Sequence, residues 1–145
     1  MKTFIQRAII LAIVIIATTS CVKKDNPAPI VAPPVMTEIS ISGESLVYNI
    51  TIFFNEGVYA NHNKTGDLTR NNLSVVLASG ETFIVSYIVT HSACQKNANI
   101  RVVLNKEPSI NEVITVQPTS CFSIYNFNGI GMCSTEKLSI SIDGT

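Results

Sequence analysis

The segment LVYNITIFF, residues 46–54, decides the fold of this chain. Its side chains alternate between the apolar set Leu46, Tyr48, Ile50, Ile52 and Phe54 and the intervening set Val47, Asn49, Thr51 and Phe53. Successive residues of a β-strand point to opposite faces of a sheet, whereas an amphipathic helix repeats every 3.6 residues. The period of two therefore predicts a β-strand with one face turned to a core.

The same period recurs along the rest of the chain. It is present in the segments around Ile39 to Ile41, Leu73 to Leu77, Ile100 to Leu104 and Leu138 to Ile142. Two further runs, Phe83 to Thr90 and Glu112 to Val116, are apolar on both faces, which is typical of central strands.

Turn-forming residues separate these runs. They are Ser42 to Glu44, Asn61 to Gly66, Ser79-Gly80, Gln95 to Asn97, Pro108 to Asn111 and Asn126 to Gly131. No amphipathic helical segment of useful length is found in the sequence. Seven short strands in about 110 residues predict an all-β fold, an antiparallel immunoglobulin-like β-sandwich. Tryptophan is absent, so an antibody-type domain is not expected.

The first 20 residues have the pattern of an export signal. Lys2 and Arg7 form a positive start, the run from Ala8 to Ala17 is apolar, and Thr18 to Ser20 are small and polar. The apolar run has 10 residues, whereas a membrane-spanning helix needs about 20. We therefore expect residues 1–20 to be a signal peptide that is removed.

The position of Cys21 makes this signal more specific. A cleavage point immediately before a cysteine resembles the lipobox of bacterial lipoproteins, although Thr18 stands where that family prefers leucine. The resemblance implies that Cys21 is diacylated, becomes the new N-terminus and anchors the protein in the outer membrane. An ordinary secretory signal with a cysteine nearby is the alternative.

Residues 21–35 read as a linker between this anchor and a domain at residues 36–145. Four of the six prolines lie here, at positions 27, 29, 33 and 34, and they favour extended polyproline geometry. At about 3 Å per residue the linker forms a semi-rigid tether. Lys23, Lys24 and Asp25 resemble the charged export tags of surface lipoproteins in Bacteroidota, which implies display at the cell surface.

Charge and length exclude several classes of protein. Removing residues 1–20 leaves 125 residues, enough for one domain, with 8 basic against 10 acidic side chains. No basic surface for nucleic acid is expected from this balance. The partners predicted are a membrane, through the lipid, and an unknown protein or glycan.

The segment TIFFNEGVYANHNKTGDLTRNNLSVVLASG, residues 51–80, resembles a bacterial immunoglobulin-like repeat named after a cyanobacterial swimming-motility surface protein, the SwmB type. SYIVTHSA at residues 86–93, NEVITVQP at 111–118 and SIYNFNGIGM at 123–132 match later parts of that repeat. Cys94 stands at a usual glycine and Asn126 at a usual aspartate. Such repeats occur in tandem arrays of adhesin-like proteins. The resemblance implies a module for adhesion or structural interaction, here in one copy.

Several residues of these motifs have structural roles in our interpretation. We expect Glu56 to accept backbone N–H groups and Gly57 to adopt a conformation that other residues resist. Tyr125 and Met132 are expected to plug one open end of the sandwich, with Gly129 and Gly131 permitting the tight return.

Catalysis is not expected. The two histidines, His62 and His91, lie far apart in the sequence without a recognisable acid or nucleophile beside them. No nucleophile elbow, zinc-protease helix, phosphate loop or Cys-x-x-Cys pair occurs. We therefore predict that the protein is not an enzyme.

Three further hypotheses concern ligands and disulfides. Cys121 and Cys133 bracket one short loop and are the expected disulfide pair in an oxidising compartment; partly buried thiols are the alternative. Glu56, Asn61, Asn63 and Asp67 offer oxygen atoms to calcium, although a solvated turn explains them better. Phe122, Tyr125 and Phe127 could stack on a sugar ring if they face water, although such residues more often belong to the core. No cofactor is expected apart from the lipid on Cys21.

Overall fold

The structure is a computed structural model that describes residues 32–79, 81–133 and 135–142. Its seven strands are β1 (Met36–Glu44), β2 (Val47–Phe54), β3 (Leu73–Leu77), β4 (Ile84–Thr90), β5 (Asn97–Leu104), β6 (Glu112–Pro118) and β7 (Leu138–Ile142). No helix is found among the described residues. The predicted signal peptide, the lipidation residue Cys21 and most of the linker lie outside the described residues.

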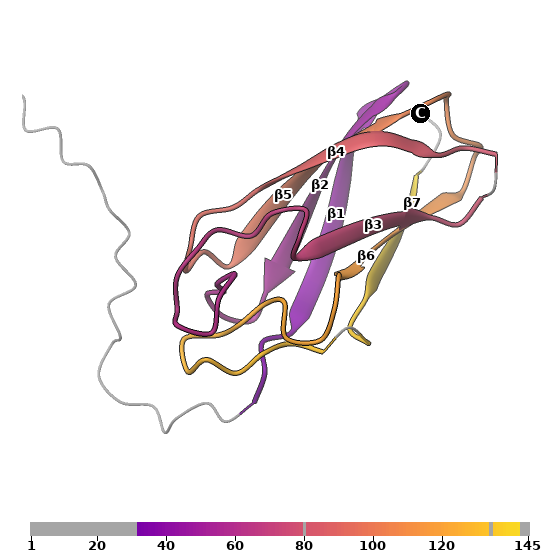
Figure 1. Cartoon of the computed structure of the whole chain (residues 1–145). Coiled ribbons are helices and arrows are strands. Elements are labelled where there is room, and N and C mark those ends of the chain that lie inside the picture. The colour runs from indigo at the N-terminus through magenta and orange to yellow at the C-terminus, as the bar shows by residue number, and fades with distance from the viewer. Residues whose placement is uncertain (1–31, 80, 134, 143–145) are drawn as a thin grey trace, which may run out of the picture.

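The strands form two sheets with antiparallel pairing throughout (Figure 1). One sheet has the order β1-β2-β5-β4 and the other has the order β3-β6-β7. This assignment of first, second, fifth and fourth strands to one sheet is the arrangement of a constant-type immunoglobulin domain. The predicted all-β, immunoglobulin-like sandwich is confirmed.

The core lies between the two sheets, and the alternation of residues 46–54 places β2 in it. Tyr48, Ile50, Ile52 and Phe54 are buried, while Asn49 is exposed. The facing residues of β5 and β6 share this burial: Ala98, Ile100, Val102, Leu104, Ile114 and Val116. Full burial of an isoleucine or leucine side chain stabilises the fold by roughly 1.5–3 kcal/mol, so these strands provide most of the hydrophobic stabilisation.

The two runs that are apolar on both faces have different places in the sheets. β6 is the central strand of its sheet, as predicted. β4 is instead an edge strand, and the prediction of a central strand was wrong. Its inward side chains Ile84, Tyr87 and Val89 pack on the core, whereas Val85 and Ile88 are 60% and 62% exposed.

The first hairpin also differs from the prediction. Its turn is formed by Ser45 and Leu46, not by Ser42 to Glu44, because β1 and β2 stay paired up to Glu44 and Val47. Ser45 has a φ of 54°, a left-handed conformation that closes this two-residue turn. Leu46 therefore leaves the strand pattern and lies at the surface.

The two ends of the sandwich are distinct. The end formed by residues 55–72, 91–96 and 119–133, where the chain enters β1, is called the tether end (Figure 1). The opposite end, formed by residues 45–46, 78–79, 81–83 and 105–111, is called the far end. β1 begins at the tether end and β7 finishes at the far end.

Candidate functional site

The tether end holds every site residue suggested by the sequence apart from Cys21. The incoming chain is fixed there by Asn55, whose side-chain oxygen accepts the N–H of Val35 at 2.9 Å and whose own N–H donates to the Val35 carbonyl at 3.0 Å. The domain is therefore held by the linker at this end.

Asn126 organises the tether end from a fully buried position. Its side-chain oxygen accepts the N–H groups of Asn128 and Ile130, each at 2.9 Å. Its Nδ2 donates to Glu56 Oε1 at 3.3 Å and to the Ala32 carbonyl at 3.0 Å. An asparagine can donate two of these bonds and an aspartate cannot, which gives a physical reason for the amide at this position. The sequence pattern predicts a turn that begins at Asn126, but it does not indicate these bonds to distant segments.

The partner of Glu56 differs from our expectation. Its carboxylate accepts the side-chain amide of Asn126, and no backbone N–H bond to its side chain is found among the described residues. Gly57 does not have a positive φ either. Its lack of a side chain is needed for space, because a Cβ atom there would collide with the carbonyl group of Cys94.

His91 is a second buried polar residue of the tether end, with 7% of its surface exposed. Its Nδ1 accepts the N–H of Leu68 at 3.1 Å, and its Nε2 lies 3.3 Å from the carbonyl of Gln95. These partners require a neutral ring with its proton on Nε2. Burial lowers the pKa of His91 below 6.5, while the Gln95 carbonyl and the charge of Asp67 act in the opposite direction.

The side chains considered for calcium are bonded to separate partners. Asp67 accepts the N–H of Ala93 at 2.7 Å, and Glu56 is bound to Asn126. Within their own turn, Asn61 Nδ2 donates to the Thr65 carbonyl and Asn63 Oδ1 accepts the Thr65 hydroxyl. No group of three or more His, Cys, Asp or Glu side chains suited to a metal is found among the described residues. The structure therefore does not gather these four residues into a cage.

Two aromatic residues of the last loop, Tyr125 and Phe127, contact a side chain from residues 62–64 of the same chain. The Lys64 ammonium lies 4.6 Å from the ring centroid of Phe127, a cation–π contact. His62 and Tyr125 make an edge-to-face contact with ring centroids 6.2 Å apart. Met132 is fully buried, as expected for a residue that plugs this end, and Tyr125 is half-buried. Gly129 has a φ of 76°, which permits the predicted tight return.

Phe122 lies in the same loop and is 64% exposed, with a φ of 63°. Such a conformation is unfavourable for a bulky residue. Its backbone N–H donates to the Met132 carbonyl, and Gly131 lies against its ring. Phe122 is thus the aromatic residue of this loop that faces water most fully.

The cysteines differ from the predicted pairing. Cys121 and Cys133 are exposed, and no disulfide joins the two in the described part of the chain. Cys94 is disulfide-bonded, although the prediction set it apart from the pair. Sequence separation alone was a weak guide, because a disulfide requires a specific distance and direction between two Cβ atoms.

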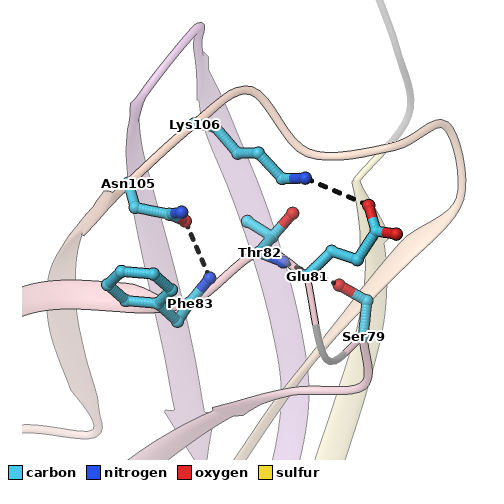
Figure 2. A network of polar contacts seen from close by, with 6 residues as sticks. All are labelled: Ser79, Glu81, Thr82, Phe83, Asn105 and Lys106. Atoms are coloured by element: carbon cyan, nitrogen blue, oxygen red, sulfur yellow. Dashed lines mark hydrogen bonds and ion pairs between the residues drawn. The ribbon is translucent and has the colours of Figure 1, made fainter.

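The far end carries a polar network that fixes the start of β4 (Figure 2). Asn105 Oδ1 accepts the N–H of Phe83 at 2.8 Å, and Lys106 forms an ion pair of 3.1 Å with Glu81. Ser79 Oγ accepts the N–H of Thr82 at 3.2 Å. The backbone of Phe83 is held in place while its side chain stays 59% exposed.

The exposed apolar side chains of β4 were not selected from the sequence. They are Val85 and Ile88, and the exposed Phe83 directly precedes the strand. The available signal was the segment Thr82 to Thr90 itself, which contains no charged residue, proline or glycine. In the middle of a sheet, neighbouring strands bond to the backbone of such a strand on both sides. At the edge of a sheet, its unpaired backbone N–H and C=O groups can bond to a strand of another molecule.

Comparisons with known proteins found no matching family model, no matching curated protein and no matching solved structure. The resemblance to the SwmB-type repeat therefore stays a prediction. No helix that could span a membrane is found in the part of the chain that the structure describes.

Proposed function

We propose that this protein is an outer-membrane lipoprotein displayed at the cell surface. Its lipid anchor is on Cys21, and its immunoglobulin-like sandwich serves adhesion or structural interaction without catalysing a reaction. The alternative within the same proposal is a module that binds a glycan.

The observation that carries the proposal is the difference between the two ends of the sandwich. The linker joins the tether end through Asn55 and Val35. The far end carries three of the nine large apolar side chains that are exposed among the described residues, Leu46, Phe83 and Ile110, and two more, Val76 and Val85, lie in the adjoining ends of β3 and β4. A domain anchored at one end presents its opposite end and its sides to partners, and exposed apolar groups mark surfaces of interaction.

The surroundings of the histidines also support a role without catalysis. His91 holds two backbone groups, and His62 packs against Tyr125. A general base needs a free nitrogen within reach of a substrate proton, with a poised pKa. Structural partners already occupy both nitrogen atoms of His91.

The test of the anchor is metabolic labelling with a palmitate analogue, comparing the native chain with Cys21→Ala. The native chain is expected to carry label and the variant to lose it. Protease treatment of intact cells should then degrade the labelled protein. An unlabelled native chain would refute the anchor, and a labelled chain that resists protease would refute surface display.

Disulfide mapping provides an independent check, because Cys94 is disulfide-bonded and the chain has four cysteines. A lipidated Cys21 has its sulfur in a thioether and has no thiol left for a disulfide. Peptide mapping of the mature protein without reduction identifies the cysteine that is bound to Cys94. A peptide that joins Cys94 to Cys21 would contradict lipidation.

The glycan alternative is favoured by the exposed ring of Phe122 in the last loop. Exposed aromatic rings stack on the apolar faces of sugars through dispersion and hydrophobic contact. Binding to a glycan array should be lost in Phe122→Ala and retained in Phe83→Ala, which removes a ring of similar exposure at the far end. Equal binding by both variants, or no binding by the native protein, would exclude this alternative.

A further inference from the structure

The β4 strand is the least protected sheet edge of the molecule. It pairs with β5 on one side only, and no strand among the described residues pairs with its other side. Backbone N–H and C=O groups at such an edge can bond to a further strand. The residues from Thr82 to Thr90 include no charge and no proline that would discourage this pairing.

The other three edges carry features that limit pairing. β1 includes the exposed Glu38 and Glu44, and its register shifts between Met36 and Glu38. β3 and β7 have only five residues each. Charges, irregular register and short length are the ways in which natural edge strands avoid association. β4, with seven residues and the exposed side chains of Val85 and Ile88, has none of these protections apart from a register shift between Ile84 and Ser86 at its start.

We propose that β4 pairs with β4 of a second copy of this chain, antiparallel and about a two-fold axis. This inference rests on the proposed function and names the partner in adhesion. Rotation about an axis perpendicular to the sheet joins the two four-stranded sheets into one, with both cores on the same side. The exposed Val85 and Ile88 of each copy then lie beside the uncharged strand of the other.

The charge that precedes β4 favours the antiparallel arrangement. Glu81, with its side chain 84% exposed, lies at the far end and is paired with Lys106 of its own copy. Antiparallel pairing keeps the two Glu81 side chains at opposite ends of the seam. Parallel pairing would place Glu81 beside Glu81, which is unfavourable for like charges.

The antiparallel arrangement places the two tether ends at opposite ends of the pair. β4 runs from the far end at Ile84 to the tether end at Thr90, so the second copy runs the other way. Two lipid anchors at opposite ends fit two facing membranes. Pairing on one membrane would require one linker to run back along the whole domain, which would use most of its extended length at about 3 Å per residue. The contact therefore joins one cell to another.

The first experiment measures the association of the mature chain in solution, with Cys21→Ser to remove the lipid. Sedimentation velocity over a range of concentrations should show a reversible dimer of micromolar or weaker affinity, since one strand pair is a small interface. Ile88→Lys should raise the dimer Kd at least tenfold, because symmetry places two charges at the seam. Ile110→Lys makes the same type of exchange at a residue that is 76% exposed on the far end and should leave the Kd unchanged.

The second experiment uses phosphatidylcholine vesicles that carry the lipidated protein, with light scattering as the measurement. Native protein and Ile110→Lys should aggregate the vesicles, since many weak contacts act together. Ile88→Lys should leave the vesicles dispersed. A solution dimer that does not aggregate vesicles would overturn the facing-membrane arrangement, and a monomer in both assays would overturn self-pairing. A solution dimer together with a native chain that palmitate does not label would leave self-pairing in place and refute the proposed anchor.

Discussion

Protonation of His91 should destabilise the folded protein. The Nδ1 atom accepts the N–H of Leu68 at 3.1 Å. A proton on Nδ1 would place an N–H of the ring opposite the N–H of Leu68, and the hydrogen bond would be lost. A buried backbone N–H left without an acceptor costs about 1–3 kcal/mol. The pKa of His91 is lowered in the folded state, chiefly by burial, so the neutral ring is the form that the fold stabilises.

The direction of the pH effect follows from this lowered pKa. Above about pH 6.5 the ring is neutral in both the folded and the unfolded chain, and its contribution to stability is constant. Below that pH the unfolded chain binds the proton more tightly, so the free energy of unfolding falls as the pH falls. The slope is at most about 1.4 kcal/mol per pH unit, which limits the loss to about 2 kcal/mol at pH 5. Asp67, the acidic residue whose charge acts on His91, reduces this loss.

Urea unfolding of the native chain and of His91→Gln from pH 8 to pH 5 measures the effect. Glutamine can offer an oxygen to Leu68 and does not titrate in this range. The native protein should lose stability below pH 6.5 while His91→Gln stays level, with equal m-values. Parallel curves for the two proteins would refute the assignment of His91 as a buried, neutral acceptor.

Three further substitutions test the local geometry, each by urea or thermal unfolding. Asn126→Ala should cost about 2–4 kcal/mol, because the N–H groups of Asn128 and Ile130 lose their acceptor; an unchanged midpoint would contradict the role of Asn126. Gly57→Ala should destabilise by about 1–3 kcal/mol, since its Cβ meets backbone atoms that cannot move aside; a neutral result would mean that this part of the chain yields easily. Ser45→Gly should stabilise by about 0.5–1 kcal/mol by relieving the positive φ, and a loss of stability would show that the Ser45 side chain contributes more than its strain.

The sequence by itself determined which side chains face the core. The period of two assigns Ile50, Ile52 and Ile100 to one side of their strands, because a strand admits only two directions for its side chains. Five of the seven strands could be predicted for this reason, and the other two from runs of β-branched and apolar residues. The turn between β1 and β2 was misplaced because Ser45 adopts a positive φ that glycine would have signalled more clearly.

Only the tertiary structure decided which strands are neighbours and which polar groups meet. β4 and β6 have similar composition, yet one is an edge and the other is central, because strand order depends on how distant segments pair. Asn126 meets Glu56 and Ala32 across 70 and 94 residues of chain, and no local pattern encodes such contacts. The sequence thus specifies the faces of the strands through local periodicity. The exposed edge and the buried polar network exist only once distant segments are brought together.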